Sequence, residues 1–241
     1  MAKQIKSKER VAEHGEVFTN EREVNAMLDL VKPETERIDS RFLEPACGEG
    51  AFLRPVLKRK LDVVKTNYKK SPLDYEKYSL IALMSLYGVD LLEDNVQICR
   101  NNLYKIWDEE YTKTTKSEAT DRVRKVAQFI LKKNILCGDA LSLIQSNGEP
   151  IIFVEWSFVS GNMIKRRDFR LDELLKAEEN NFQASLFDEL FSDGSTRTMN
   201  WELDEETGIY MPRPIKDDYP LTEYRRIDDY EYGTMSRFKT T

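Results

Sequence analysis

The stretch from Phe42 to Leu53 constrains the fold more than any other part of the chain. A short apolar run ends at the acidic residue Glu44, and a turn with glycines at Gly48 and Gly50 leads into a helical pattern. Glycine permits positive φ and a close approach of the backbone to a ligand, and the start of a helix leaves N–H groups without an intrahelical partner. The stretch therefore predicts a strand–turn–helix unit that suits a nucleotide-like cofactor.

Length and composition favour one sizeable α/β domain with appendages. A chain of 241 residues can bury a real core. No apolar run approaches the roughly 20 residues that span a bilayer, and the basic N-terminus has no apolar segment behind it, so we expect a cytoplasmic protein. The three cysteines are too scattered for a disulfide framework or a metal site, and a single histidine argues against a Ser-His-Asp arrangement.

The charge balance restricts the partners of the chain. Its net charge is −6 and its pI is near 5.2. A protein that binds a phosphate backbone by itself normally has a basic face. If this chain acts on nucleic acid, we expect a partner to supply much of the electrostatic attraction.

Apolar spacing predicts the elements around the glycine turn. Asn20 and Glu23 form a capping-box pattern at the start of a helix over residues 19–32, and Pro33 is expected to end that helix. The elements predicted after it are a strand at 41–44, a helix at about 51–64, an insertion at 65–78 with a helix that begins at Ser71 and Pro72, a strand at 86–90, a helix at 94–110, an insertion at 112–120, a helix at 123–132, a strand at 134–137, a short helix, and a strand at 151–154.

Strands that alternate with helices predict a doubly wound, mostly parallel sheet of Rossmann-like type, with helical insertions. In such sheets ligands bind at the carboxyl ends of the strands. The predicted strands end at Glu44, Asp90 and Asp139. We therefore expect three carboxylates along one edge of the sheet.

The pattern changes after about residue 155, which divides the chain into three expected segments. Residues 1–35 form an N-terminal helical segment, residues 36–158 the core, and residues 159–241 an irregular, charged and aromatic extension. The extension contains a basic run at 165–170 and helical patterns at 172–179 and 182–191. It is interpreted either as a surface for another subunit or as a wrap over the domain, and its basic run either as a phosphate contact or as a solvated face.

The glycine turn and the segment upstream of it carry the first part of a family resemblance. Leu43–Leu53 resembles the motif Asp-Pro-Ala-Cys-Gly-Ser-Gly-x-Phe, with Glu44 in place of aspartate and Glu49 in place of serine. Gly15–Asn20 resembles Gly-x-Phe/Tyr-x-Thr-Pro, with Asn20 in place of proline.

Two further segments, Tyr87–Asp90 with the residues up to Asn95, and Asn134–Leu141, resemble the second and third motifs of the same family. Over residues 14–155 the chain thus resembles the γ-type DNA adenine methyltransferases of restriction–modification systems. These enzymes transfer a methyl group from S-adenosylmethionine to the exocyclic amine of adenine.

The resemblance implies an S-adenosylmethionine site. The implied cofactor contacts are Phe18, Thr19, Glu44, Ala46, Gly48, Gly50, Asp90, Leu91, Asp139 and Ala140. Glu44 would lie near the cofactor ammonium group, Asp90 would accept hydrogen bonds from the ribose hydroxyls, and Asp139 from the adenine amine. Each motif taken singly has a plainer interpretation, namely a glycine turn of another α/β enzyme or an acidic residue that caps the next helix.

The fourth motif of the family, Asn/Asp-Pro-Pro-aromatic, holds and stacks the target base and is missing from this chain. Glu155 and Trp156 occupy its expected position after the strand at 151–154. Trp156 is interpreted either as a base-stacking group or, preferably, as a core residue. Loss of a stacking platform forfeits about 1–3 kcal/mol per base, and loss of a preorganised hydrogen-bonding group costs about 10²–10³ in rate.

These observations lead to the hypothesis of a cofactor-binding modification (M) subunit of a split DNA adenine-N6 methyltransferase. A second polypeptide would supply the missing motif, the target recognition and most of the DNA contact. One alternative is an S-adenosylmethionine-binding or scaffolding protein without methylation activity. Another is a methyltransferase that acts on RNA or protein.

Overall fold

The computed structural model describes residues 10, 19–175, 201–203, 210–216 and 219–229, which form a mixed α/β fold. Its central sheet has the strand order β1-β2-β3-β4. The strands β1 (Phe42–Glu44), β2 (Leu86–Asp90) and β3 (Ile135–Asp139) are parallel, and the short β4 (Ile144–Gln145) pairs antiparallel with β3. The three parallel strands place their carboxyl ends at one edge of the sheet.

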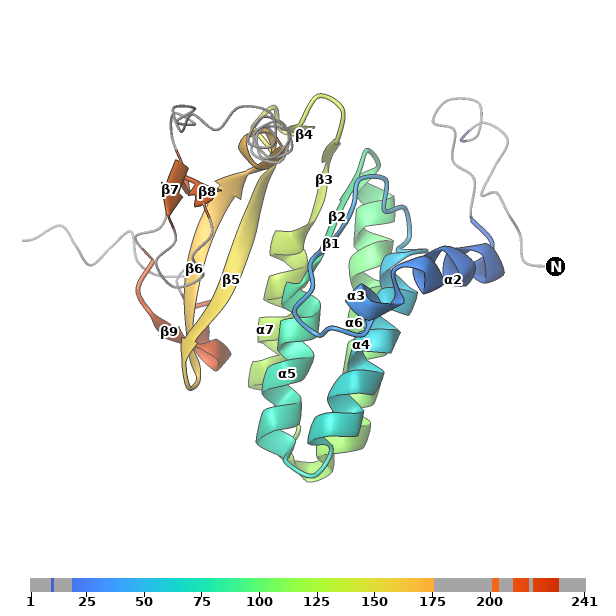
Figure 1. The fold of residues 1–241 in the computed structure, drawn as a ribbon, viewed down its shortest axis with the longest axis vertical. Coiled ribbons are helices and arrows are strands. Elements are labelled where there is room, and N and C mark those ends of the chain that lie inside the picture. Colours follow the sequence, from blue (N-terminus) through green and yellow to red (C-terminus); the bar gives the residue numbers. More distant parts are fainter. Residues whose placement is uncertain (1–9, 11–18, 176–200, 204–209, 217–218, 230–241) are drawn as a thin grey trace, which may run out of the picture.

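Helical elements connect or precede these strands. They are α2 (Glu21–Leu30), α3 (Lys32–Thr35), α4 (Leu53–Tyr68), α5 (Pro72–Met84), α6 (Glu93–Thr115), the 3₁₀ turn η1 (Lys116–Glu118) and α7 (Asp121–Asn134). Residues 171–175 are also helical. In Figure 1, α4 to α7 extend well below the sheet as a bundle.

Polar side chains fix where several helices begin. Asn20, Ser71 and Thr120 each accept a hydrogen bond from the first turn of α2, α5 and α7, respectively. Such caps satisfy N–H groups that have no intrahelical partner. At their other ends α5 and α7 lead almost directly into β2 and β3, so each forms one continuous helix–strand rod (Figure 1).

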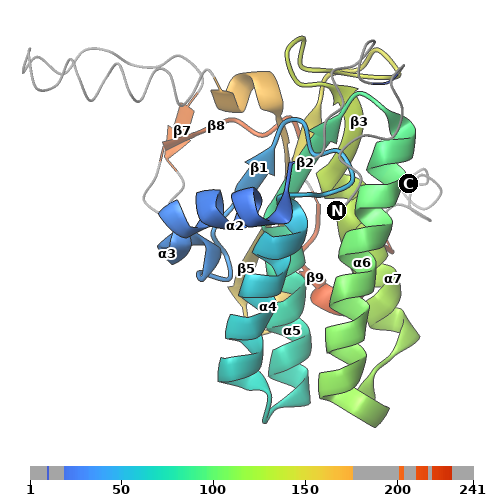
Figure 2. The ribbon, with the colours of Figure 1, turned by 90° about the vertical axis from the view of Figure 1, so that its right-hand side faces the viewer.

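The central sheet has α4 and α6 on one face, and a second, antiparallel sheet covers its opposite face (Figure 1 and Figure 2). It consists of β5 (Ile152–Ser160), β6 (Met163–Arg170) and β9 (Thr222–Glu223), and β9 leads into the 3₁₀ turn η2 (Tyr224–Arg226). The small pair β7 (Trp201–Leu203) and β8 (Tyr210–Pro212) forms a sheet of its own. Figure 2 looks onto the opposite side, where α4 and α6 lie in front of the strands.

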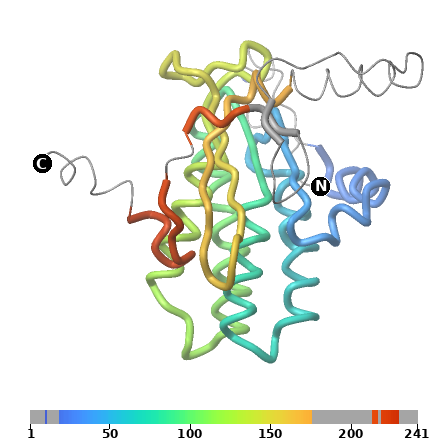
Figure 3. Tube along the Cα trace, turned by 60° about the vertical axis from the view of Figure 1, so that its left-hand side comes forward, coloured from blue at the N-terminus to red at the C-terminus, as the bar shows by residue number. Residues whose placement is uncertain are grey.

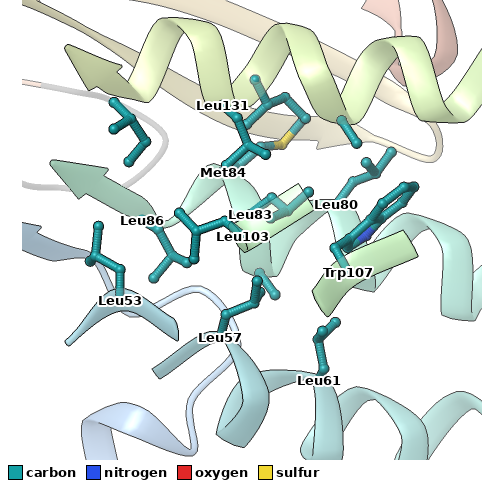
Figure 4. Close-up of a cluster of buried hydrophobic side chains, with 14 of the residues drawn as sticks. Leu53, Leu57, Leu61, Leu80, Leu83, Met84, Leu86, Leu103, Trp107 and Leu131 are labelled. Carbon is teal, nitrogen blue, oxygen red and sulfur yellow. The ribbon is translucent and has the colours of Figure 1, made fainter. Parts of the chain in front are cut away.

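The core follows the alternation of side chains along β2. Leu86 points into the large apolar cluster formed by α4 to α7, whose centre is drawn in Figure 4. Tyr87 and Val89 point the other way, where Tyr87 contacts Phe153 of β5 edge to face, with ring centroids 5.1 Å apart. One strand thus joins the helical layer to the second sheet.

Buried polar groups tie together the amino ends of the strands. The side chain of Asn134 donates to the carbonyl oxygens of Met84 and Leu86, at 3.1 and 3.0 Å. The fully buried Lys60 of α4 donates to the carbonyl oxygens of Ile38 and Ser40 and to the Ser85 hydroxyl. Both side chains link the segments that enter β1, β2 and β3.

The described C-terminal residues return to the bundle (Figure 3). Glu76 of α5 is buried and accepts hydrogen bonds from the hydroxyls of Tyr111 and Tyr224 and from Arg225. Val24 from the N-terminal segment and Ile227 from the extension belong to the same core cluster. These described residues of the extension therefore pack against the domain.

The structure corrects several predicted elements. The helix expected over residues 19–32 ends at Leu30, and Pro33 lies in the first turn of α3 rather than after a helix. The chain after Asp139 forms turns and β4 instead of a short helix. The helix expected at 182–191 lies outside the described residues, as does the second half of the one expected at 172–179, whose first half is helical.

The largest correction concerns the strand expected at 151–154. It is the first half of β5, which continues to Ser160 and pairs antiparallel with β6 rather than joining the parallel sheet. The expected boundary at residue 158 consequently falls inside β5. Among the described residues the central sheet is covered by helices on one face and by a second sheet on the other, so its winding departs from the doubly wound expectation.

Candidate functional site

The loops after β1, β2 and β3 enclose one cavity of about 610 Å³, here called the strand-end cavity. It is lined by Thr19, Glu44, Pro45, Ala46, Cys47, Gly48, Glu49, Ala51, Phe52, Asp90, Leu91, Leu92, Asn95, Gly138, Asp139, Ala140 and Leu141. Its size falls in the range of small-molecule sites. Glu44, Asp90 and Asp139, expected to line one edge of the sheet, share this cavity.

The first loop is shaped by two glycines in the left-handed region. Gly48 has φ of 51° and Gly50 has φ of 87°. The amide of Cys47 donates to the Val89 carbonyl at 2.8 Å, and the amide of Gly50 donates to the Cys47 carbonyl at 2.8 Å. Because only glycine adopts these φ values without strain, the turn depends on both positions.

Asp90 holds the first and second loops together. One of its carboxylate oxygens accepts from the amide of Gly48 at 2.9 Å. The other accepts from the amide of Leu92 at 2.9 Å and from the side chain of Asn95 at 3.1 Å. A carboxylate offers about four acceptor positions, so about one remains for a ligand.

Asn95 and Arg10 extend this network, and the sequence reasoning assigned neither a role. Asn95 is buried, lines the cavity and orients Asp90. Arg10 donates to Asp94 at 2.7 Å and to the side-chain oxygen of Asn95 at 3.3 Å. The position of Asn95 in the first turn of α6, within the polar run that follows β2, is the signal that would have identified it.

Asp139 lies at the end of β3, where the chain turns into β4. Its carboxylate accepts from the amide of Leu141 at 2.9 Å, and the hydrogen bonds from Leu141 and Ser142 lower the pKa of Asp139. A Cβ atom on Gly138 would approach the Ile144 carbonyl oxygen to 2.7 Å, so glycine is required for this tight pairing. Because its pKa is lowered, the Asp139 carboxylate is ionised at neutral pH beside the cavity.

Glu44 is the half-buried acid of the site. Burial raises the pKa of its carboxyl group, and a hydrogen bond from the amide of Ala46 opposes that effect. A carboxylate that is partly removed from water gains more from a cationic ligand than an exposed one does. A ligand with an ammonium group would supply that charge.

The mouth of the cavity carries exposed apolar side chains. Leu91 is 59% exposed and Leu141 is 95% exposed, and they come from the loops after β2 and β3, respectively. With Ala140 they give the cavity an apolar part beside its carboxylates. A ligand with an apolar ring and polar edges fits such a lining.

Eight of the ten expected cofactor contacts line this cavity: Thr19, Glu44, Ala46, Gly48, Asp90, Leu91, Asp139 and Ala140. Gly50 does not line it. A Cβ atom at Gly50 would meet the Cys99 sulfur at 3.1 Å. Gly50 therefore lets the turn pack against α6 on the side away from the cavity. Phe18 lies outside the described residues.

Glu155 and Trp156, expected where a catalytic motif should stand, lie away from the cavity in the middle of β5. Glu155 is buried between Arg41 and Arg167. The indole of Trp156 donates to Asn134 at 3.1 Å and contacts Phe129 edge to face. Glu155 is engaged in ion pairs and Trp156 packs against the core, which supports the core interpretation of Trp156 and places both residues outside the cavity.

Comparisons with protein-family models, with curated proteins and with solved structures found no match to this chain. No helix among the described residues is long and apolar enough to cross a membrane. Within the same residues, no group of three or more histidine, cysteine, aspartate or glutamate side chains is arranged to hold a metal ion.

Proposed function

We propose that this chain binds S-adenosylmethionine as the M subunit of a split DNA adenine-N6 methyltransferase of a restriction–modification system. A partner polypeptide supplies the Asn-Pro-Pro-aromatic motif and the target recognition. The observation that carries the proposal is the strand-end cavity, which gathers Glu44, Asp90 and Asp139 from three successive parallel strands.

The cavity suits the different parts of this cofactor. Glu44 is a half-buried carboxylate for an ammonium group, and Asp139 is an acceptor for an exocyclic amine. Leu91 and Ala140 supply apolar contacts for a purine ring. Asp90 retains about one acceptor position, enough for a single ribose hydroxyl. When bound, S-adenosylmethionine supplies the methyl group.

The need for a partner follows from what the cavity lacks. Its lining contains no Asn-Pro-Pro-aromatic segment, and Glu155 and Trp156 are engaged elsewhere. Extruding a base from a duplex costs a few kcal/mol, which a stacking group normally offsets. Methylation by the chain alone is therefore expected to be negligible.

Calorimetric titration of the full chain with S-adenosylmethionine tests the cofactor site. We expect binding by the wild type and clearly weaker binding by Asp139→Ala and Ala46→Tyr. The first removes an acceptor, and the second places a large side chain in the cavity. Asp62→Ala, on the exposed side of α4, is the matched control and should bind like the wild type. No heat of binding by a folded wild type would refute the proposal.

The split-enzyme part has its own test. The reading frame next to this gene should encode an Asn-Pro-Pro-aromatic motif near its start, and its product should co-purify with this chain. The complex should then transfer tritiated methyl groups to the N6 position of adenine in duplex DNA. A chain that binds the cofactor while no such complex methylates DNA would instead be a cofactor-binding regulator or scaffold. The internal use of Asp90 and the lack of a base-holding group favour that second function.

A further inference from the structure

The outer face of α7 presents two lysines that no described residue neutralises. Lys125, Gln128 and Lys132 are exposed on one side of this helix and are here called the α7 lysine face. Together with Arg122 and two C-terminal aspartates they line an open hollow of about 730 Å³. The hollow lies on α7, apart from the strand-end cavity and lined by none of its residues.

The acidic groups beside this face are already engaged. Arg122 forms ion pairs with Asp228 and Asp229, and Arg226 pairs with Asp229 at 2.8 Å. These pairs lower the pKa of Asp229, with Arg226 as the largest cause. Lys125 and Lys132 make no ion pair with any residue that the structure describes. The hollow thus holds uncompensated positive charge on a chain whose net charge is −6.

The spacing of the lysines matches a repeating polyanion. Positions 125, 128 and 132 share one helix face because they are three, four and seven residues apart. Seven residues of an α-helix span about 10.5 Å along its axis. Phosphates on one strand of duplex DNA advance about 3.4 Å per nucleotide along the helix axis, so three steps cover nearly the same length.

We propose that the α7 lysine face binds the backbone phosphates of duplex DNA, with Gln128 as an additional hydrogen-bond donor between the two ammonium groups. The choice of DNA rests on the proposed function, whereas the charge and spacing of the face do not. Lys132 lies at the end of α7 that leads into β3, whose far end forms the strand-end cavity (Figure 1).

Fluorescence anisotropy of a labelled DNA duplex, titrated with the full chain at low and rising salt, tests this inference. We expect wild-type binding to weaken steeply with salt. The double variant Lys125→Gln/Lys132→Gln should bind at least about tenfold more weakly at low salt. Its slope of log K against log salt should fall by about 2, one unit for each phosphate that a lysine no longer neutralises.

The control is Lys58→Gln/Lys70→Gln, which makes the same charge change at exposed positions in α4 and just after it. It should retain most of the affinity and the wild-type slope. Equal losses in the two double variants, or no DNA binding by the wild type at about 50 mM salt, would overturn the inference. Tighter binding of labelled polyglutamate than of DNA, lost in the same variant, would overturn it in favour of an acidic polypeptide.

Calorimetry with S-adenosylmethionine separates this inference from the proposed function. A chain that binds the cofactor but shows no difference between the two double variants keeps its proposed function and loses the α7 site. A chain that binds DNA through Lys125 and Lys132 but does not bind the cofactor keeps the site and loses the function.

Discussion

The two ends of the central parallel sheet use polar side chains in opposite ways. At the amino end, Lys60 and Asn134 are fully buried and direct their donors to backbone carbonyls of neighbouring segments. At the carboxyl end, Glu44 accepts a hydrogen bond from the amide of Ala46, and Asp139 accepts hydrogen bonds from Leu141 and Ser142, both at the edge of an open cavity. The amino end fixes the positions of the strands, and the carboxyl end keeps acceptors available for a ligand.

Asp90 combines the two uses of polar side chains. It lies at the carboxyl end and lines the cavity, yet it makes three internal hydrogen bonds, as the anchors of the amino end do. Substitutions at the amino end should therefore mainly change stability, substitutions at Glu44 or Asp139 mainly ligand binding, and substitutions at Asp90 both. Four variants test this division.

The largest loss of stability is expected for Asn134→Leu. The substitution leaves the buried carbonyls of Met84 and Leu86 without this donor and the partly buried Trp156 indole without its acceptor. Each buried unsatisfied group costs about 1–3 kcal/mol, so we expect a loss of about 3 kcal/mol in urea unfolding. Asn101→Leu, at an exposed position of α6, is the control. Equal stability of the two variants would contradict the anchoring role.

Lys60→Met should change how stability depends on pH. Burial lowers the pKa of Lys60 to about 7, whereas the unfolded chain keeps the ordinary value near 10.5. Between these values the unfolded state binds more protons, so the free energy of unfolding of the wild type should rise with pH, by roughly 2 kcal/mol from pH 7 to pH 9.

That rise should be absent from Lys60→Met and present in Lys58→Met, which alters an exposed lysine of the same helix. The measurement is urea unfolding at several pH values between 7 and 9. If the curve of Lys60→Met runs parallel to that of the wild type, the ammonium group of Lys60 is not the cause.

Asp90→Asn should have an intermediate effect. The amide keeps the size of the side chain but loses acceptor capacity toward Gly48, Leu92 and Asn95, and a partly exposed site should lose about 1 kcal/mol in thermal or urea unfolding. Affinity for S-adenosylmethionine should fall as well. A variant that is less stable but binds the cofactor normally would move Asp90 to the anchoring group.

The smallest effect on stability is expected for Leu141→Ser. The side chain is 95% exposed, so its removal should change the free energy of unfolding by less than about 0.5 kcal/mol. Cofactor affinity measured by calorimetry should nevertheless decrease, because Leu141 lines the cavity. Loss of stability without loss of cofactor affinity would show that Leu141 serves the fold rather than ligand binding, contrary to the role proposed for the carboxyl end of the sheet.

Local patterns were sufficient to predict the cavity. An apolar run that ends in an acid identified β1, β2 and β3 and the carboxylates Glu44, Asp90 and Asp139 at one edge. The caps Asn20 and Ser71 were equally visible. These features depend on backbone chemistry within a few residues, so sequence reasoning can find them.

The antiparallel pairing of β5 with β6 was not predicted, because it depends on residues that are not adjacent in the sequence. A short apolar run such as residues 151–154 suits a parallel or an antiparallel strand equally well. The turn at Gly161-Asn162, where Gly161 has φ of 55°, was the available hairpin signal. The basic run that follows concealed β6, because Arg166 and Asp168 are buried as a bidentate pair in place of apolar residues.

The carboxylate of Glu76 has a consequence for the synthesis of the chain. Of its three hydrogen-bond partners Tyr111 follows 35 positions later, whereas Tyr224 and Arg225 follow only 148 and 149 positions later. Until Tyr224 and Arg225 are synthesised, we expect water to supply the hydrogen bonds that they donate to Glu76 in the folded chain. Packing of this part of the interior therefore waits for the synthesis of Tyr224 and Arg225, and we expect a nascent chain that stalls before them to expose apolar surface.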